Sequence, residues 1–222
     1  MPRPGRGGNP RTVWFRHHPS PLGLNRRVPA LNRLLDLGRT IRAIGFDDAP
    51  FNKETDATVA VGGVVCAGTR MEGMVWGEAT RDGNDATEVI ANLLLNSKFA
   101  AQVHVVLIDG LAVGGMNLVD LPALAERLQR PCIAVMRRLP NLPAMEAVIA
   151  RFPDADRRLH LLRAAGPIHT IGPTPFQVAG CTPEIAARVL RVLGDRGVVP
   201  EALRLAHLIG GAVKRGQSGK RA

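Results

Sequence analysis

Aspartates end two apolar segments of the sequence, and their positions give the first indication of chemistry. Residues 103–108 are apolar except for one histidine, and Asp109 follows them directly. Residues 42–46 lead in a similar way to Asp47 and Asp48. Buried strands have this character, and neighbouring strands lie about 5 Å apart. If the two strands are neighbours, the sequence predicts that their terminal carboxylates share one small volume and bind a divalent cation.

A third acid is available in the segment RDGND, as either Asp82 or Asp85. Mg²⁺ and Mn²⁺ take carboxylate oxygens and commonly use only one or two protein carboxylates, together with waters and substrate phosphates. Such a site would activate water for in-line attack on a phosphodiester. Both aspartates also have a plainer interpretation. Asp82 precedes a glycine, as turn residues do, and Asp85 precedes Glu88 by three residues, which is typical of an N-cap with a capping box.

Glycines follow the second apolar segment at positions 110, 114 and 115. Glycine lets the backbone approach another group closely. We expect Gly110, Gly114 and Gly115 to admit either a substrate backbone or a neighbouring element. Aspartate at a strand end is also an ordinary turn residue. The alternative therefore stays open that these aspartates only form turns and caps and bind no metal.

Other patterns of catalytic residues are weaker. His207 lies among apolar residues of an amphipathic segment, which favours a partly buried histidine bonded within the core over a general base. Cys181 follows a glycine, but only the adjoining helix start would lower its pKa. The sequence has no G-x-S-x-G elbow, no Walker glycine-lysine loop and no H-E-x-x-H motif.

The composition indicates one α/β domain in a chain of 222 residues. No apolar run reaches the roughly 18 residues of a membrane-spanning helix, so we expect no membrane association. Three cysteines far apart in the sequence favour reduced thiols and a cytoplasmic location. The net charge of +10 favours a polyanionic partner such as nucleic acid.

The positive charge is concentrated at the N-terminus. Residues 1–40 contain eight arginines and one acid, which supply +7 of the +10. We expect residues 1–39 to be a basic, irregular leader in which residues 31–37 could form one or two helical turns, 40–216 to be a single domain, and 217–222 to be a basic tail. The leader could bind phosphates through release of counterions, or it could have no fixed role.

The expected elements follow from hydrophobic periodicity and helix-start signals. Strands are predicted at 41–47, 58–67, 71–80, 103–108, 131–136, 168–171 and 176–179, and helices at 86–97, 118–129, 143–152, 154–165, 182–193 and 200–216. A three-strand meander, a crossover helix and then parallel strands describe a ribonuclease H-like mixed sheet flanked by helices. In that sheet the first and fourth strands are neighbours, which brings Asp47 or Asp48 next to Asp109.

Several segments, taken in order, resemble the family called domain of unknown function 99, which is allied to endonuclease V. They are IRAIGFDDAPF, RDGNDATEVI, VVLIDGLAVGGMNLVDL, FQVAGCTPEIA and VVPEALRLAHLIGGAV. The resemblance implies a ribonuclease H-like fold and cleavage of DNA or RNA near deaminated adenine, with magnesium held by acids. Asp47 and Asp109 match the aspartates of strands one and four of endonuclease V, and Asp82 or Asp85 falls in the segment where endonuclease V has a glutamate.

The resemblance is incomplete in two places. The late Gly-His pair of endonuclease V aligns with Gly180 and Cys181, so that histidine is missing here. The Pro-Tyr-Ile-Pro wedge has no counterpart, because the chain contains no tyrosine. The leading hypothesis is an endonuclease V-like hydrolase of nucleic acid, dependent on Mg²⁺ or Mn²⁺, with a possible role in repair. The alternatives are a catalytically inactive nucleic-acid-binding or scaffold protein, and a hydrolase of small nucleotides. The sequence leaves the oligomeric state open.

Overall fold

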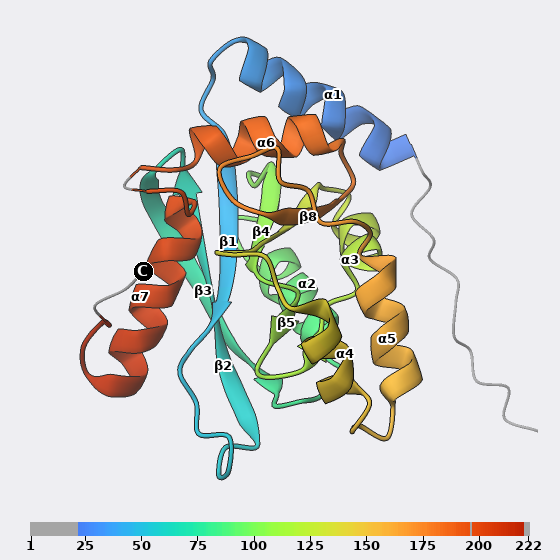
Figure 1. The fold of residues 1–222 in the computed structure, drawn as a ribbon. Coiled ribbons are helices and arrows are strands. Elements are labelled where there is room, and N and C mark those ends of the chain that lie inside the picture. Colours follow the sequence, from blue (N-terminus) through green and yellow to red (C-terminus); the bar gives the residue numbers. More distant parts are fainter. Residues whose placement is uncertain (1–21, 196, 220–222) are drawn as a thin grey trace, which may run out of the picture.

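A computed structural model describes residues 22–195 and 197–219, which form a mixed sheet with helices on both faces (Figure 1). The strands are β1 (Arg42–Asp48), β2 (Thr58–Ala67), β3 (Arg70–Thr80), β4 (Val105–Asp109), β5 (Ala112–Val113), β6 (Asn117–Leu118), β7 (Cys132–Val135) and β8 (Phe176–Ala179). The helices are α1 (Leu22–Asp36), α2 (Ala86–Leu95), α3 (Leu121–Leu128), α4 (Leu142–Ile149), α5 (Ala155–Ala164), α6 (Pro183–Val192) and α7 (Glu201–Arg215).

The main sheet has the strand order β3-β2-β1-β4-β7-β8. Strands β1, β2 and β3 form an antiparallel meander, β1 pairs in parallel with β4, β4 pairs in parallel with β7, and β8 is antiparallel to β7. The ribonuclease H-like mixed sheet predicted from the sequence is therefore confirmed. Its central pair, β1 and β4, is the pair that carries the strand-end aspartates.

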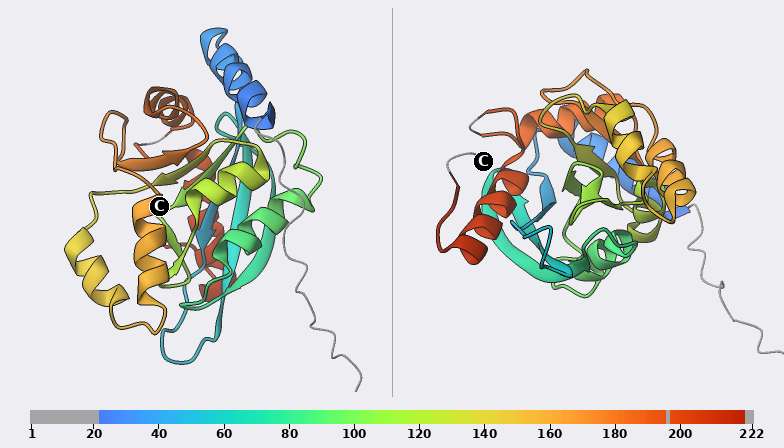
Figure 2. Two further views of the ribbon diagram at one scale, coloured as in Figure 1. Left: turned by 90° about the vertical axis from the view of Figure 1, so that its right-hand side faces the viewer. Right: turned by 60° about the horizontal axis from the view of Figure 1, so that its bottom comes forward.

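Side chains of β1 and β4 alternate between two cores, because successive residues of a strand point to opposite faces. Ile44, Phe46 and Ile108 pack with α2, α3 and α5 in one core. Ala43 and Leu107 pack with α1 and α6 in the core on the other face. Helix α7 lies against β1 and β2 on this second face, where Ala202 and Ala206 are buried among the residues of a smaller cluster (Figure 2).

The expectation of an irregular leader over residues 1–39 is wrong for its second half. Residues 22–36 form α1, and its Leu31 is buried in the same core as α6. Arg188 of α6 donates hydrogen bonds to Asn32 and Asp36, at 2.8 and 2.7 Å. Docking on α6 thus supplies the stability that the sequence of this helix lacks by itself. Residues 1–21 and 220–222, which include most of the expected leader and half of the expected tail, lie outside the described residues.

Smaller differences concern element boundaries. The strand expected at 168–171 is a single bridge between His169 and Phe176. The helix expected from residue 118 begins at Leu121, because Asp120 is its N-cap and the preceding residues pair as the two-stranded sheet of β5 and β6. In the described part of the chain, no helix combines the length and apolar character needed to cross a membrane.

Candidate metal centre

Asp47 and Asp109 extend from the C-terminal ends of two adjacent parallel strands. The register of β1 and β4 pairs Phe46 with Ile108, so the next residue on each strand is an aspartate. Phe46 and Ile108 face the core that contains α2. The period of two therefore turns Asp47 and Asp109 to the opposite face, where α7 lies. The predicted convergence of the two carboxylates is what the structure shows.

His207 of α7 completes a group of three potential ligands. Its Nδ1 lies 2.9 Å from Oδ2 of Asp47. Asp47, Asp109 and His207 each offer one ligand atom, and these atoms all lie within 4.8 Å of one another. Asp47 is buried, with 8% of its side chain exposed, whereas His207 is 38% exposed. The group is thus anchored in the sheet and accessible from one side.

Gly45 explains how α7 comes close enough to place His207. A Cβ atom built at Gly45 would lie 2.7 Å from the backbone N of Leu203 in α7, so only glycine permits this contact. From Gly45 to Asp47 the strand advances two residues, about 6.6 Å. From Leu203 to His207 the helix advances four residues, about 6 Å. These similar rises set the imidazole beside the carboxylate.

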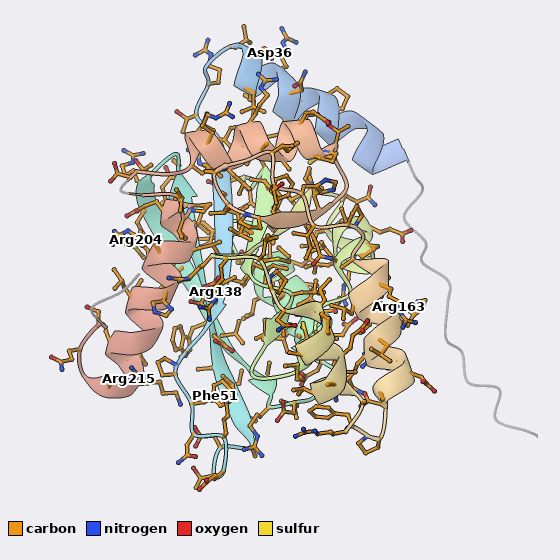
Figure 3. The ribbon with its side chains drawn as sticks, in the orientation of Figure 1. Asp36, Phe51, Arg138, Arg163, Arg204 and Arg215 are labelled. Carbon is orange, nitrogen blue, oxygen red and sulfur yellow. The ribbon has the colours of Figure 1, made fainter. Side chains whose placement is uncertain are left out.

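Arg137 stands beside the second aspartate. It follows β7, the strand next to β4, and its Nη2 donates to Oδ2 of Asp109 at 3.0 Å. The side chain of Arg137 is 36% exposed, so this guanidinium faces solvent as well as the site. The loop that holds it also carries Arg138, which Figure 3 labels. A cation at the mouth of an acidic site can bind a phosphate oxygen.

The electrostatics of the site fit a divalent cation. Burial and the charge of Asp47 raise the pKa of Asp109 above its ordinary value, although Arg137 acts in the other direction. The hydrogen bond to Asp47, followed by the Asp47 charge, raises the pKa of His207 against the effect of burial. Like charges held this close repel, and a bound cation would relieve that repulsion. Two carboxylates and one imidazole suit Mn²⁺, and carboxylates with waters suit Mg²⁺.

Asp48 lies on the other face of β1 and has a different role. Its Oδ2 accepts a hydrogen bond of 2.6 Å from the backbone N–H of Gly114. Burial raises the pKa of Asp48 to about 6, with smaller contributions from Asp47 and Asp109 and opposition from the Gly114 hydrogen bond. Of the two neighbouring aspartates left open by the sequence, Asp47 joins the group of three and Asp48 holds the loop after β4.

Asp82 also fastens that loop and does not belong to the group of three. Its Oδ1 accepts from the backbone N–H of Met116 at 2.8 Å, and its own N–H donates to the carbonyl of Gly114. A Cβ atom at Gly115 would lie 2.3 Å from Asp82 Oδ1, and Gly115 has a φ of 92°. Gly114 and Gly115 therefore serve contacts within the protein, whereas a Cβ atom at Gly110 would meet nothing within 4 Å.

Asp85 lies at the start of α2, outside the group of three. Asp85 occupies the N-cap position of α2 as expected, but the expected capping box is wrong, because the Asp85 side chain makes no cap hydrogen bond and Glu88 instead pairs with Arg127. Asp85 accepts from the hydroxyl of Thr80 at 2.7 Å and from the amide of Asn117 at 2.6 Å. Oδ1 of fully buried Asn117 accepts a hydrogen bond of 3.0 Å from the first backbone N–H of α2, that of Ala86. The cap is supplied by a residue 31 positions away.

Sequence reasoning missed His207 and Arg137 as site residues. The histidine that the family alignment placed at Gly180 and Cys181 is absent there, but α7 brings a histidine to the acids from another segment. A usable signal was present, because small residues at 202, 206 and 210 indicate a helix face that packs closely on a strand, with His207 beside it. Burial raises the pKa of the Cys181 thiol to about 12, which disfavours the nucleophilic thiolate.

Comparisons with known proteins agree with this architecture. The family model described as Endonuclease dU matches residues 39–214. A UPF0215 protein of Pyrococcus furiosus is 36% identical over 187 residues, which cover 82% of this chain and 96% of that protein. A UPF0215 protein of Methanopyrus kandleri is 32% identical over 192 residues, which cover 84% and 98%.

Solved structures give the same result. A protein of unknown function from Archaeoglobus fulgidus superposes with a TM-score of 0.74 at 31% identity, over 78% of this chain and 98% of that one. The catalytic domain of human endonuclease V has a TM-score of 0.52 at 14% identity, over 89% and 98% of the two chains, and this likeness concerns the fold alone. The extent of the family match and the identity to the archaeal relatives establish that the chain belongs to the Endonuclease dU family.

Proposed function

We propose that this protein is a divalent-cation-dependent endonuclease that hydrolyses phosphodiester bonds of DNA at deoxyuridine. The observation that carries the proposal is the convergence of Asp47, Asp109 and His207 at the ends of β1, β4 and along α7. The substrate is suggested by the description of the family, Endonuclease dU. A role in repair would follow from that substrate, because uracil in DNA is a damaged base.

In this proposal Asp47, Asp109 and His207 hold Mg²⁺ or Mn²⁺. When bound, the cation supplies an activated water and neutralises charge on the phosphate. Asp47 and Asp109 are fixed by their strands, so little reorganisation is needed to present both oxygens. Asp48 and Asp82 keep the loop at 114–116 in place, and Asp85 secures the start of α2.

Arg137 is the residue suited to meet the scissile phosphate. Its guanidinium now pairs with Asp109 and is partly exposed, so it can turn to a phosphate oxygen without leaving the site. A guanidinium forms strong charge-assisted hydrogen bonds with phosphate and stabilises negative charge that develops there. The residue would thus contribute to catalysis more than to cation binding.

Basic residues beyond the end of β1 would guide the nucleic-acid strand to the site. Lys53, Lys214 and Arg215 line a hollow of about 550 Å³ together with Phe51. Arg215 lies at the C-terminal end of α7, and Phe51 follows β1 by three residues (Figure 3). Positive side chains bind the backbone of nucleic acid through phosphate contacts and release of counterions.

Cleavage assays test the proposal directly. Purified protein is incubated with DNA oligonucleotides that contain one deoxyuridine or, as the control, one thymidine, in Mn²⁺, Mg²⁺ or EDTA. We expect cation-dependent cleavage of the deoxyuridine strand. Asp109→Asn should reduce the rate by about 100-fold or more, as expected when a group that supports transition-state charge is lost. Cleavage that persists in EDTA or in Asp109→Asn would overturn it.

A second function is favoured by one contact. Arg137 already pairs with Asp109 at 3.0 Å, so the acids are partly neutralised by the protein itself. A catalytically inactive protein that binds nucleic acid, or a scaffold, would need no cation at these acids, because Arg137 already pairs with one of them. Such a protein would bind DNA with a strong dependence on salt, and this binding would be unaffected by EDTA and by Asp47→Asn.

A further inference from the structure

A buried threonine hydroxyl without a partner lies near the candidate metal centre. Thr174 stands between Pro173 and Pro175, just before β8. The residue is buried, with 3% of its surface exposed. Among the residues that the structure describes, its hydroxyl oxygen, Oγ1, has no hydrogen-bond partner. Buried polar groups are nearly always paired, because an unpaired one costs free energy, so this hydroxyl calls for a partner.

The register of the sheet places Thr174 beside Arg137. Strands β7 and β8 are antiparallel, and just beyond their ladder the backbone N–H of Met136 donates to the carbonyl oxygen of Pro175 at 2.8 Å. A residue before proline favours extended backbone, so Thr174 continues the line of β8. The next pair along the two chains is Arg137 and Thr174. Cβ atoms of directly opposite residues in such a pair are about 4.5 to 5.5 Å apart.

Both side chains belong to the face of the sheet that carries the metal centre. Phe176 of β8 and Val135 of β7 pack in the core that contains α1 and α6. Thr174 precedes Phe176 by two residues and Arg137 follows Val135 by two, so the period of two gives them the same face. Because β7 lies between β4 and β8, Arg137 has Asp109 on one side and Thr174 on the other.

We propose that the hydroxyl of Thr174 is a second acceptor for the guanidinium of Arg137, and that it holds this guanidinium when the acids bind a cation. The inference rests on the cation site of the proposed function. In the structure Arg137 donates to Asp109 at 3.0 Å. With a cation at Asp109 the guanidinium meets repulsion between like charges, so it turns towards β8. Thr174 then accepts one of its N–H groups, and the others are left for a phosphate oxygen. Thr174 is thus a positioning residue that acts through Arg137.

Mn²⁺ affinity, measured by isothermal titration calorimetry without nucleic acid, tests this role. Thr174→Val exchanges the hydroxyl for a methyl group of similar size. We expect it to bind Mn²⁺ about tenfold more weakly, because the cation-bound state alone loses a hydrogen bond to a charged group. Thr174→Ser keeps the hydroxyl and should bind Mn²⁺ as the wild type does. Equal affinity of the wild type and Thr174→Val overturns the proposal.

Melting in EDTA distinguishes this role from an ordinary structural one. The hydroxyl of Thr174 has no partner to lose there, so Thr174→Val should melt no lower than the wild type. The matched control is Thr182→Val, because the Thr182 side chain caps α6 and accepts from the backbone N–H of Ile185 at 3.4 Å. That variant should melt lower and keep wild-type Mn²⁺ affinity. A Thr174→Val protein that melts lower in EDTA and keeps its Mn²⁺ affinity overturns the proposal.

A double-mutant cycle tests whether Thr174 acts through Arg137. Arg137→Met removes every N–H that the hydroxyl could accept. In that background Thr174→Val should leave the Mn²⁺ dissociation constant unchanged, because residues that interact show non-additive effects. A tenfold loss that persists without the guanidinium overturns the assignment to Arg137.

Cleavage assays keep this inference apart from the proposed reaction. Coupling between Thr174 and Arg137 in Mn²⁺ binding supports the inference even where the protein cleaves no deoxyuridine DNA, and in that case the proposed endonuclease alone fails. Cleavage by the wild type without such coupling overturns the inference alone. A wild-type protein that binds no Mn²⁺ overturns both.

Discussion

His207 Nδ1 lies 2.9 Å from Asp47 Oδ2, and this contact joins the last helix to the first strand of the sheet across 160 positions of the chain. The pair links the candidate metal centre to the packing of the whole fold. A neutral imidazole in this position can coordinate a cation together with the two aspartates, and a protonated one can form an ion pair with Asp47. Both states keep the histidine at the site, so its removal has measurable consequences for cation binding.

We expect His207→Ala to weaken Mn²⁺ binding at pH 7.5 at least about tenfold, which corresponds to about 1.4 kcal/mol. The physical reason is the loss of one of three ligands that already converge. Isothermal titration calorimetry measures the dissociation constant. The control is His160→Ala, since His160 is exposed on α5. Unchanged Mn²⁺ affinity in His207→Ala would show that the aspartates bind the cation without it.

Gly45→Ala should displace α7 and damage the site without touching a ligand. The added methyl group would lie 2.7 Å from backbone atoms of Ala202 and Leu203, a distance that forces the helix outward. Overpacking of this kind costs about 1 to 3 kcal/mol in the free energy of unfolding. Chemical denaturation and Mn²⁺ titration measure the two effects. Gly194→Ala is the control, because its added methyl group would lie no closer than 3.4 Å to any neighbouring atom.

The metal-free protein should lose stability as the pH rises through about 6. Asp48 has an ordinary pKa of 3.8 that burial raises to about 6 in the folded state. Its contribution to stability is complete below pH 4. It is lost between about pH 4 and pH 6, because the folded protein must then hold a charged carboxylate in a buried position. The change is at most about 3 kcal/mol for a shift of this size. Asp109 is shifted in the same direction.

Denaturation in EDTA at pH 4, pH 5 and pH 7 measures this slope. Carboxylates whose pKa is lowered, such as Asp154, titrate below that window. Asp48→Asn keeps an acceptor for the N–H of Gly114 and should reduce the slope, with the remainder due to Asp109 and His207, whose pKa values are also raised. A cation offsets the repulsion among the deprotonated acids, so added Mn²⁺ should stabilise the wild-type protein more at pH 7 than at pH 5. A flat profile for the wild-type protein in EDTA would contradict the raised pKa of Asp48.

The sequence was sufficient for the sheet and for half of the site, because those depend on local pattern. Strand-end aspartates after apolar runs, combined with the crossover topology, predict that Asp47 and Asp109 converge. His207 could not be assigned in the same way. Its position depends on contact between Gly45 and α7, which are separated by more than 150 residues. A histidine beside an apolar helix face looks the same in sequence whether a strand or solvent lies next to it.

Long-range partners also explain the remaining errors. Helix α1 contains an internal proline, Pro29, and is held by Leu31 in the core and by Arg188 of α6. The capping box at Asp85 satisfied the sequence rule, yet Asn117 takes over the cap and Asp85 turns to Thr80. Local rules predict which groups need partners, whereas the tertiary fold decides which partners they receive.

Arg137→Gln should separate cation binding from catalysis. Without the guanidinium at 3.0 Å from Asp109, the acids lose a competing positive charge, so Mn²⁺ should bind several-fold more tightly. Cleavage of deoxyuridine DNA should nevertheless fall by about 10- to 1,000-fold, because charge on the phosphate loses its donor. Arg138→Gln is the control, since it removes the same charge from the next position. Tighter Mn²⁺ binding with unchanged cleavage would mean that Arg137 only competes with the cation for Asp109 and takes no part in cleavage.

Asp85→Ala should behave as a structural variant, although the sequence left Asp85 open as a third ligand. Its removal would leave one amide N–H of fully buried Asn117 without its acceptor, while the amide still donates to the carbonyl of Thr80 at 2.8 Å. An unpaired buried group costs about 1 to 3 kcal/mol, whereas the exposed hydroxyl of Thr80 can bond to water. We therefore expect a lower melting temperature with an unchanged Mn²⁺ dissociation constant at 20 °C, where the protein stays folded. Asp82→Ala, which frees the N–H of Met116, is the comparison. Whichever of the two variants weakens Mn²⁺ binding as strongly as His207→Ala would be the third acidic ligand, and the cation would then lie closer to the 114–116 loop than the three converging side chains place it.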